Sequence, residues 1–190
     1  MMQDLAVPLR HTWFLIGLSA LVATGCGSPP PDWPRLDPPI AAPDFTLQQL
    51  DAGTVRLSDL RGRVVIMEFW ATWCGPCRFS TPSLDVIYRK FRGRGVTVLL
   101  INQGETAERV RTWVEGRFQA PILLDQDGRV AMRYGVQGIP RLFIVNQAGQ
   151  ILYVRSGYGG GLERDLTAIL DDLLATQSAR RNSARPFSAS

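Results

Sequence analysis

Cysteine and histidine are both scarce in this chain. Its 190 residues include 3 cysteines and 1 histidine, too few for a scaffold held together by several disulfides. A structural zinc ion needs four ligands, which the chain cannot supply once His11 is set aside with the N-terminal segment. A basic stripe interleaved with aromatic residues is missing too. Much of the net charge of +4 lies in Arg180, Arg181 and Arg185, so we do not expect nucleic-acid binding.

A hydrophobic run long enough to span a membrane is also missing from the N-terminal segment. The apolar stretch from Trp13 to Ala23 is shorter than the ~20 residues that a spanning helix needs, but its length is typical of a signal peptide. It ends in Leu21-Val22-Ala23-Thr24-Gly25-Cys26, which resembles the lipobox of bacterial lipoproteins. We expect residues 1–25 to be a lipoprotein signal peptide and Cys26 to carry the lipid. A plain secretory signal and an uncleaved anchor are the alternatives, and both would also export the domain.

Proline is concentrated between the signal segment and the rest of the chain. Residues 26–43 contain Pro29, Pro30, Pro31, Pro34, Pro38, Pro39 and Pro43. Proline fixes φ and has no N–H to donate, so we predict an extended linker over this range. At the other end, residues 177–190 are polar and basic, and we predict a disordered tail. The domain itself is therefore expected over residues 44–176.

Short apolar runs alternate with amphipathic stretches inside this domain. The run from Val64 to Trp70 is interrupted only by Glu68, a pattern typical of a strand buried on both faces. The predicted strands cover residues 45–47, 55–57, 64–70, 96–101, 122–124, 141–145 and 151–155, and the predicted helices cover 75–91, 106–118, 127–134 and 162–175. This order predicts an α/β fold in which an N-terminal β-hairpin precedes a central mixed sheet flanked by helices.

The segment Trp73-Cys74-Gly75-Pro76-Cys77 joins a predicted strand to a predicted helix. Two intervening residues allow both sulfurs to meet within one helical turn. The sulfur of Cys74 would lie beside unpaired N–H groups at the positive end of the helix dipole, which favour the thiolate. We therefore predict that Cys74 is a nucleophile open to solvent and that the shielded Cys77 resolves the mixed disulfide. Pro76 is tolerated in the first turn because its missing N–H would be unpaired there.

Other interpretations of a CxxC pair are possible. It can form half of a zinc or copper site shared with a second molecule, although the ligand count in this chain argues against that. A purely structural disulfide would close a very small loop and contribute little stability. Within redox chemistry, a disulfide oxidase or isomerase and a copper- or partner-binding module with redox-active thiols are the alternatives to a reductase.

Several further motifs accompany the cysteine pair: Trp70-Ala71-Thr72-Trp73-Cys74-Gly75-Pro76-Cys77-Arg78, Ile101-Asn102-Gln103-Gly104-Glu105, Leu124-Asp125 and Tyr134-Gly135-Val136-Gln137-Gly138-Ile139-Pro140. With these motifs, residues 41–176 resemble the TlpA/ResA branch of the thioredoxin-like redoxins, which are related to the AhpC/TSA proteins. The resemblance implies a thioredoxin fold with an inserted β-α unit between residues 95 and 124. It also implies an exported, membrane-attached reductase of protein disulfides, often serving cytochrome c maturation. Finally, it implies a monomer that uses its redox-active disulfide without a cofactor. This monomer would take electrons from a membrane donor of the CcdA/DsbD type.

The resemblance also assigns roles to individual residues. Pro140 corresponds to the cis-proline that faces the cysteine pair, and it would expose the backbone of Ile139 to a substrate strand. Glu68 corresponds to a buried acid that accepts a proton from Cys77; a carboxyl that reaches solvent or pairs with arginine is the alternative. The remaining residues expected to contact substrate are Trp73, Gly75 and Pro76.

Four further residues complete these expectations. The maturation reductases of this branch usually carry glutamate where this chain has Ser80, and threonine where it has Arg141. Asn102 and Glu105 are expected to end a strand and cap the following helix, and we assign them no chemistry.

Overall fold

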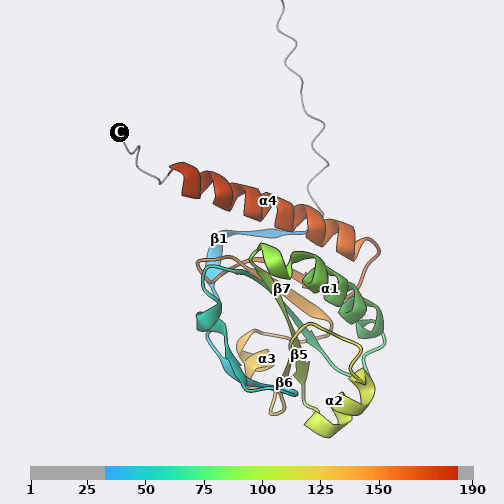
Figure 1. The fold of residues 1–190 in the computed structure, drawn as a ribbon. Coiled ribbons are helices and arrows are strands. Elements are labelled where there is room, and N and C mark those ends of the chain that lie inside the picture. Colours follow the sequence, from blue (N-terminus) through green and yellow to red (C-terminus); the bar gives the residue numbers. More distant parts are fainter. Residues whose placement is uncertain (1–32, 184–190) are drawn as a thin grey trace, which may run out of the picture.

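The computed structural model describes residues 33–183, which form a wide sheet covered by helices on both faces (Figure 1). The strands are β1 (Arg35–Ala41), β2 (Thr46–Gln49), β3 (Thr54–Arg56), β4 (Val64–Trp70), β5 (Val96–Gln103), β6 (Ile122–Asp125), β7 (Arg141–Val145) and β8 (Gln150–Ser156). The helices are α1 (Cys77–Phe91), α2 (Ala107–Val114), α3 (Arg129–Arg133) and α4 (Leu162–Ser183), with two 3-10 helices at Leu57–Leu60 and Arg92–Arg94.

The sheet is mixed, as the sequence predicted. Its strand order is β1-β8-β7-β4-β5-β6-β2-β3. The pairs β4–β5 and β5–β6 are parallel, and the other neighbours are antiparallel. The predicted N-terminal hairpin is confirmed as β2 and β3. The predicted inserted unit is formed by α2 and β6, and β6 extends the sheet beyond β5 toward β2.

Two hydrophobic cores lie on the two faces of the sheet. Side chains alternate between faces along a strand, so Val64 and Ile66 of β4 face one core while Val65 and Met67 face the other. The first core contains the apolar faces of α1, α2 and α4, and the second contains α3 and the 3-10 helix at Leu57–Leu60. Helices α1 and α4 pack beside each other (Figure 1). The central strands are thus buried on both faces, as their apolar runs indicated.

The prediction of an extended linker up to residue 43 is wrong for its last part, because that part belongs to the domain. Residues Arg35–Ala41 form β1, which pairs with β8 and adds an edge to the sheet. Trp33, just before this strand, is buried in the first core. Prolines are compatible with an edge strand, because an N–H on the outer side has no partner within the sheet. The domain therefore includes residues that its proline content alone had excluded.

The predicted end of the last helix is also wrong. Helix α4 runs to Ser183 and takes in residues that we expected to begin a disordered tail at 177. Alanine, glutamine and arginine in this stretch are compatible with helix, so propensity does not stop it. Residues 1–32, with the predicted signal segment and Cys26, and residues 184–190 lie outside the described part. Within residues 33–183, no helix combines the length and apolar character needed to cross a membrane.

Candidate active site

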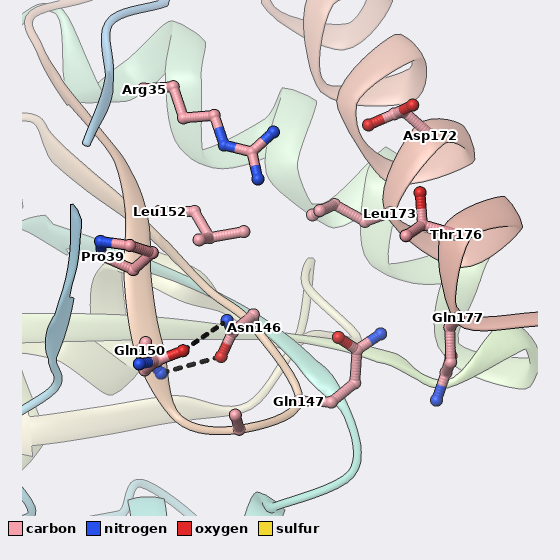
Figure 2. A pocket seen from close by; sticks show the side chains of 11 residues that line it. Arg35, Pro39, Asn146, Gln147, Gln150, Leu152, Asp172, Leu173, Thr176 and Gln177 are labelled. Carbon is pink, nitrogen blue, oxygen red and sulfur yellow. Dashed lines mark hydrogen bonds between the residues drawn. The ribbon is translucent and has the colours of Figure 1, made fainter. Parts of the chain in front are cut away.

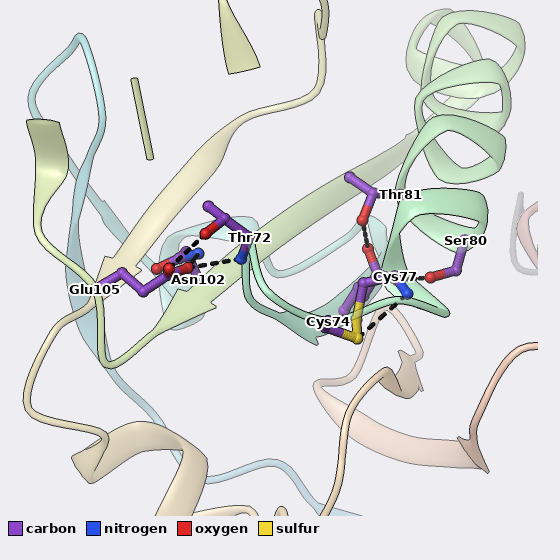
Figure 3. The surroundings of a disulfide bond; sticks show 8 residues. Thr72, Cys74, Cys77, Ser80, Thr81, Asn102 and Glu105 are labelled. Atoms are coloured by element: carbon purple, nitrogen blue, oxygen red, sulfur yellow. Dashed lines mark hydrogen bonds between the residues drawn. A yellow bond between two sulfur atoms is a disulfide. The ribbon is translucent and has the colours of Figure 1, made fainter. Parts of the chain in front are cut away.

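A disulfide between Cys74 and Cys77 lies where β4 gives way to α1 (Figure 3). The two sulfurs are bonded at 2.03 Å and the two Cα atoms are 5.3 Å apart. The backbone N–H of Cys77, the first residue of α1, donates a hydrogen bond to Sγ of Cys74 at 3.2 Å. This N–H has no partner within the helix, as at any helix N-terminus. The sulfur of Cys74 thus occupies the electropositive position that the sequence predicted.

The helix begins two residues later than predicted. Pro76 is the N-terminal cap of α1, and no side chain caps the helix. The carbonyl oxygen of Pro76 accepts hydrogen bonds from the N–H groups of Phe79 and Ser80 at 3.1 and 3.3 Å. Gly75 and Pro76 are both exposed and lie outside the helix. The expected substrate contacts Gly75 and Pro76 therefore form a surface turn between the two cysteines.

Cys74 is more enclosed in the disulfide form than we expected. Cys74 is 4% exposed and Cys77 is 1% exposed. The order of exposure agrees with the prediction, but the expectation of an open Cys74 is wrong for this oxidised form. Cys77 lies inside the first turn of α1 and is part of the same hydrophobic core as Cys74. A partner must therefore contact the protein surface around Cys74 before it can reach this sulfur.

Glu68 is fully buried beneath the start of α1. It shares a face of β4 with Ile66 and Trp70, which point toward α1. Its carboxyl accepts hydrogen bonds from the hydroxyls of Ser80 and Thr81, the latter at 2.9 Å. Burial raises the pKa of Glu68 to about 7, although the two hydroxyl donors act in the opposite direction. The alternative of a carboxyl paired with arginine or reaching solvent does not apply to this structure.

Pro140 lies at the end of β7 nearest the disulfide. Arg141, the next residue, pairs with Phe69 of β4, shortly before the cysteine loop begins. The bond between Ile139 and Pro140 is cis, as predicted. Pro140 is buried and its carbonyl accepts a hydrogen bond from the N–H of Gly157 at 2.8 Å, while Ile139 is half-buried. The sheet thus brings the proline loop to the same edge as Cys74.

A buried polar cluster around Glu105 holds the loop that leads to Cys74. The expectation that Asn102 and Glu105 cap the following helix is wrong, because Thr106 is the N-cap of α2. The carboxylate of Glu105 accepts hydrogen bonds from the N–H of Thr72 at 2.7 Å, from the Thr72 hydroxyl at 2.6 Å and from the amide of Asn102 at 2.8 Å (Figure 3). Arg109 forms an ion pair with it at 3.0 Å. Although burial alone would raise the pKa of Glu105, the donors from Asn102 and Thr72 hold it below its ordinary value. The signal that the sequence offered for this cluster was an acidic residue, Glu105, shortly after a predicted buried strand.

The two tryptophans of the motif have different environments. Trp73 is 62% exposed beside Cys74, as expected for a residue that contacts a partner. Trp70 is fully buried, and its ring lies 5.0 Å from that of Trp113. The expectation that Trp70 belongs to the core is therefore confirmed.

A separate cavity of about 730 Å3 lies between the β7–β8 turn, β1 and α4 (Figure 2). Arg35 and Asp172 are among its lining residues, with Asn146 and Gln150 at the turn. Strand β7 begins beside the disulfide and ends at this turn, so the cavity is at the opposite end of the sheet. Its lining contains no cysteine. In the part of the chain from 33 to 183, no three His, Cys, Asp or Glu side chains are grouped to hold a metal ion.

The mixed sheet, the disulfide at the N-terminus of α1 and the adjoining proline loop together define a thioredoxin-fold protein. The chain belongs to the AhpC/TSA family, whose model matches residues 40–154. This finding confirms the fold and the family resemblance that the sequence motifs indicated.

Similar proteins carry names that describe thiol chemistry. The thiol-disulfide oxidoreductase ResA of Bacillus subtilis (strain 168) is 33% identical over 117 residues, which are 61% of this chain and 65% of ResA. The match thus spans less than two thirds of that relative.

Two solved structures share the fold. A thiol:disulfide interchange protein of the thioredoxin family from Chlorobium tepidum TLS is 26% identical with a TM-score of 0.62, covering 72% of this chain and 97% of that one. The exposed lipoprotein thioredoxin Etrx1 of Streptococcus pneumoniae strain TIGR4 is 31% identical with a TM-score of 0.58, covering 69% and 98%.

Proposed function

We propose that this protein is an extracytoplasmic thiol–disulfide oxidoreductase that reduces disulfides in other proteins. The observation that carries the proposal is the hydrogen bond from the N–H of Cys77 to Sγ of Cys74 at the N-terminus of α1. That donor and the helix dipole stabilise a thiolate at Cys74, which is the attacking species in disulfide exchange. The names of the similar proteins support the same chemistry.

The reaction has two exchange steps. The thiolate of Cys74 attacks one sulfur of the substrate disulfide, forms a mixed disulfide and releases the other substrate sulfur as a thiolate. The sulfur of Cys77, once deprotonated, attacks Sγ of Cys74 and releases the second substrate thiol. The protein ends with the Cys74–Cys77 disulfide and the substrate with two thiols. Two electrons pass to the substrate, and no cofactor other than the cysteine pair takes part.

Glu68 is suited to accept the proton of Cys77 in the second step. Its carboxyl is held by Ser80 and Thr81, one turn into the helix that begins at Cys77. A pKa of about 7 allows it to take up and release a proton near neutral pH. Ser80 stands where maturation reductases usually carry a glutamate, and its hydroxyl donates a hydrogen bond to Glu68.

The substrate would contact the surface around Cys74. Trp73, Gly75 and Pro76 are exposed on one side of the disulfide, and the backbone of Ile139 lies on the proline loop. An extended substrate strand can pair with exposed backbone there, which is a common mode of peptide recognition. Pro140 shapes this loop and keeps it beside the cysteines.

The proposed setting is the outer side of a membrane. The segment ending at Cys26 resembles a lipobox, and one structural relative is described as an exposed lipoprotein. A tethered reductase needs a source of electrons, for which a membrane donor of the CcdA/DsbD type is suited. The resemblance of its motifs to the TlpA/ResA branch also suggests apocytochromes as substrates, in cytochrome c maturation.

Trapping with the full-length chain tests the proposed function. Cys77→Ser leaves the attacking thiol but removes the resolving one, so mixed disulfides with substrate proteins should accumulate in the native host. Cys74→Ser is the matched control, because it keeps one thiol at the site without the helix-terminal nucleophile. Abundant adducts with Cys77→Ser and few with Cys74→Ser are expected. Equal adducts from both variants, or none from either, would contradict the proposal.

A further inference from the structure

Large aromatic side chains are exposed around the disulfide. Trp73 is 62% exposed, Phe79 is 63% exposed and Tyr158 is 41% exposed. Trp73 precedes Cys74 directly, and Phe79 lies in the first turn of α1 after Cys77. Apolar area in contact with water is unfavourable, and aromatic rings are frequent contact residues at binding surfaces. The exposure of two rings next to the cysteine pair in the chain, and of a third that contacts one of them, therefore calls for an explanation.

Phe79 and Tyr158 form a stacked pair that connects two elements of the site. Their ring centroids are 5.8 Å apart and their planes are inclined by 25°. Phe79 belongs to α1, and Tyr158 belongs to the loop between β8 and α4. The residue before Tyr158, Gly157, donates its N–H to the carbonyl of Pro140. The pair is therefore tied to the helix of Cys77 on one side and to the proline loop on the other.

The loop that carries Tyr158 has the sequence Gly157-Tyr158-Gly159-Gly160-Gly161. Gly157 has a φ of +75° and Gly161 a φ of +86°, a region that other residues rarely adopt. Because glycines flank Tyr158, no neighbouring side chain along the loop covers its ring. The sequence thus presents one aromatic ring in a loop that otherwise has no side chains.

We propose that the Phe79–Tyr158 pair determines substrate specificity by binding an aromatic or branched apolar side chain next to the substrate cysteine. This inference rests on the proposed function. A substrate cysteine joined to Cys74 must lie beside the proline loop and the start of α1, where the pair is anchored. The neighbouring substrate residue then meets two nearly parallel rings. Contact with the rings removes apolar surface from water on the substrate residue and on the rings themselves. A small or charged substrate residue gains little binding free energy from this contact.

The test uses two homodimeric peptide disulfides that differ only in the residue next to cysteine, phenylalanine in one and alanine in the other. The pre-reduced full chain is mixed with each peptide, and the second-order rate of peptide thiol release is measured. The wild-type protein should reduce the phenylalanine peptide about tenfold faster, an effect in the range of a modest apolar contact in a specificity pocket. Phe79→Ala and Tyr158→Ala should each lower this ratio, and the double variant should bring it close to one.

Two further variants separate specificity from folding. Tyr158→Phe retains the stacked ring and should keep the wild-type preference. Ile40→Ala is the matched surface control: Ile40 is 56% exposed on β1 and pairs with Ile151, at the end of β8 away from the disulfide. Its ratio, and its rate with the alanine peptide, should equal those of the wild type.

The outcomes distinguish the two proposals. Equal reduction of both peptides by the wild-type protein, or a ratio unchanged in the double variant, overturns the specificity role and leaves the reductase function standing. Reduction of neither peptide overturns the reductase function itself, and the specificity role with it.

Discussion

The protonation of Glu68 near neutral pH depends on its position in the fold. Its carboxyl is buried, and the pKa of about 7 lies above its ordinary value of 4.5. Below pH 4.5 the carboxyl is protonated in both the folded and the unfolded chain, so it does not make the free energy of unfolding depend on pH. Between pH 4.5 and about 7 the unfolded chain releases this proton while the folded chain retains it. Stability must therefore fall as the pH rises through this window.

A Glu68→Gln variant should remove this contribution to the pH dependence. The free energy of unfolding of the wild-type protein relative to the variant should fall by about 3 kcal/mol between pH 4.5 and pH 7, because each pKa unit corresponds to about 1.4 kcal/mol. Urea unfolding of the oxidised proteins at several pH values measures the difference. Parallel stability curves would show that Glu68 does not titrate in this range.

The same variant separates the proposed proton transfer from packing. Glutamine has nearly the same shape but cannot accept a proton from Cys77. The resolution step should therefore slow by about 100-fold at pH 7, in the range of general base catalysis, and lose its dependence on pH near 7. Stopped-flow measurement of mixed-disulfide decay provides the rate. Decay at the wild-type rate across this pH range would exclude the proton role.

Glu105 stabilises the cysteine loop through several hydrogen bonds rather than through its ion pair. Arg109 is largely exposed, and exposed ion pairs contribute little. Glu105→Ala would leave the N–H of Thr72 and the amide of Asn102 without an acceptor, at a cost of about 2–4 kcal/mol in the free energy of unfolding. Arg109→Ala, as the control, should cost less than about 1 kcal/mol. Denaturant unfolding compares the two variants, and similar losses for both would contradict this account.

At the scale of elements, central strands were easier to predict than edges. The run from Val64 to Trp70 is apolar because neighbouring strands and helices bury both of its faces. β1 has an exposed outer side and two prolines, so its composition is that of a linker. Its pairing with β8 joins residues more than a hundred positions apart in the sequence, which local patterns do not encode. The end of α4 was placed too early because the polar, basic composition after residue 176 suggested a tail, although no proline or glycine occurs there before Pro186.

The segment before β1 should contribute to stability as part of the core. Trp33 is buried in the first core, and the guanidinium of Arg155 lies 5.1 Å from its ring centre. Trp33→Ala should lower the free energy of unfolding by about 3 kcal/mol, as expected for a large buried side chain. The exposed Ile40 on β1 provides the control, and Ile40→Ala should change stability by less than about 0.5 kcal/mol. A negligible effect of Trp33→Ala would indicate that this segment detaches from the domain in solution.

At the scale of the whole molecule, the parts of the site that are local in sequence were predictable from the residues, whereas Pro140 was placed only by the family resemblance and other assembled parts were missed. Cys74 and Cys77 are three positions apart, so the chemistry follows from the motif and the helix that it opens. Glu105 meets Thr72 across 33 positions of sequence, and the Phe79–Tyr158 stack joins the first helix to the last loop. Such contacts depend on the order of strands in the sheet.

We predict that the full chain is attached to a membrane through a lipid on Cys26. Cys26→Ala should shift the exported protein from the membrane fraction to the soluble fraction, because the lipid-bearing thiol is lost. Fractionation of host cells followed by immunoblotting measures the distribution, with Cys77→Ser as the control that keeps the segment intact. Unchanged partitioning of Cys26→Ala would favour an uncleaved anchor over a lipid.

The outer strands of the sheet bear on how copies of this protein behave when crowded. β1 contains Pro38 and Pro39, which have no N–H to offer a further strand, and β3 is only three residues long. Prolines and short strands at a sheet edge hinder pairing with another sheet. On a surface that confines many copies to two dimensions, as a lipid anchor would, collisions between neighbours are frequent. Edges of this kind keep those collisions from growing into shared β-structure, so each copy remains free to meet its substrates.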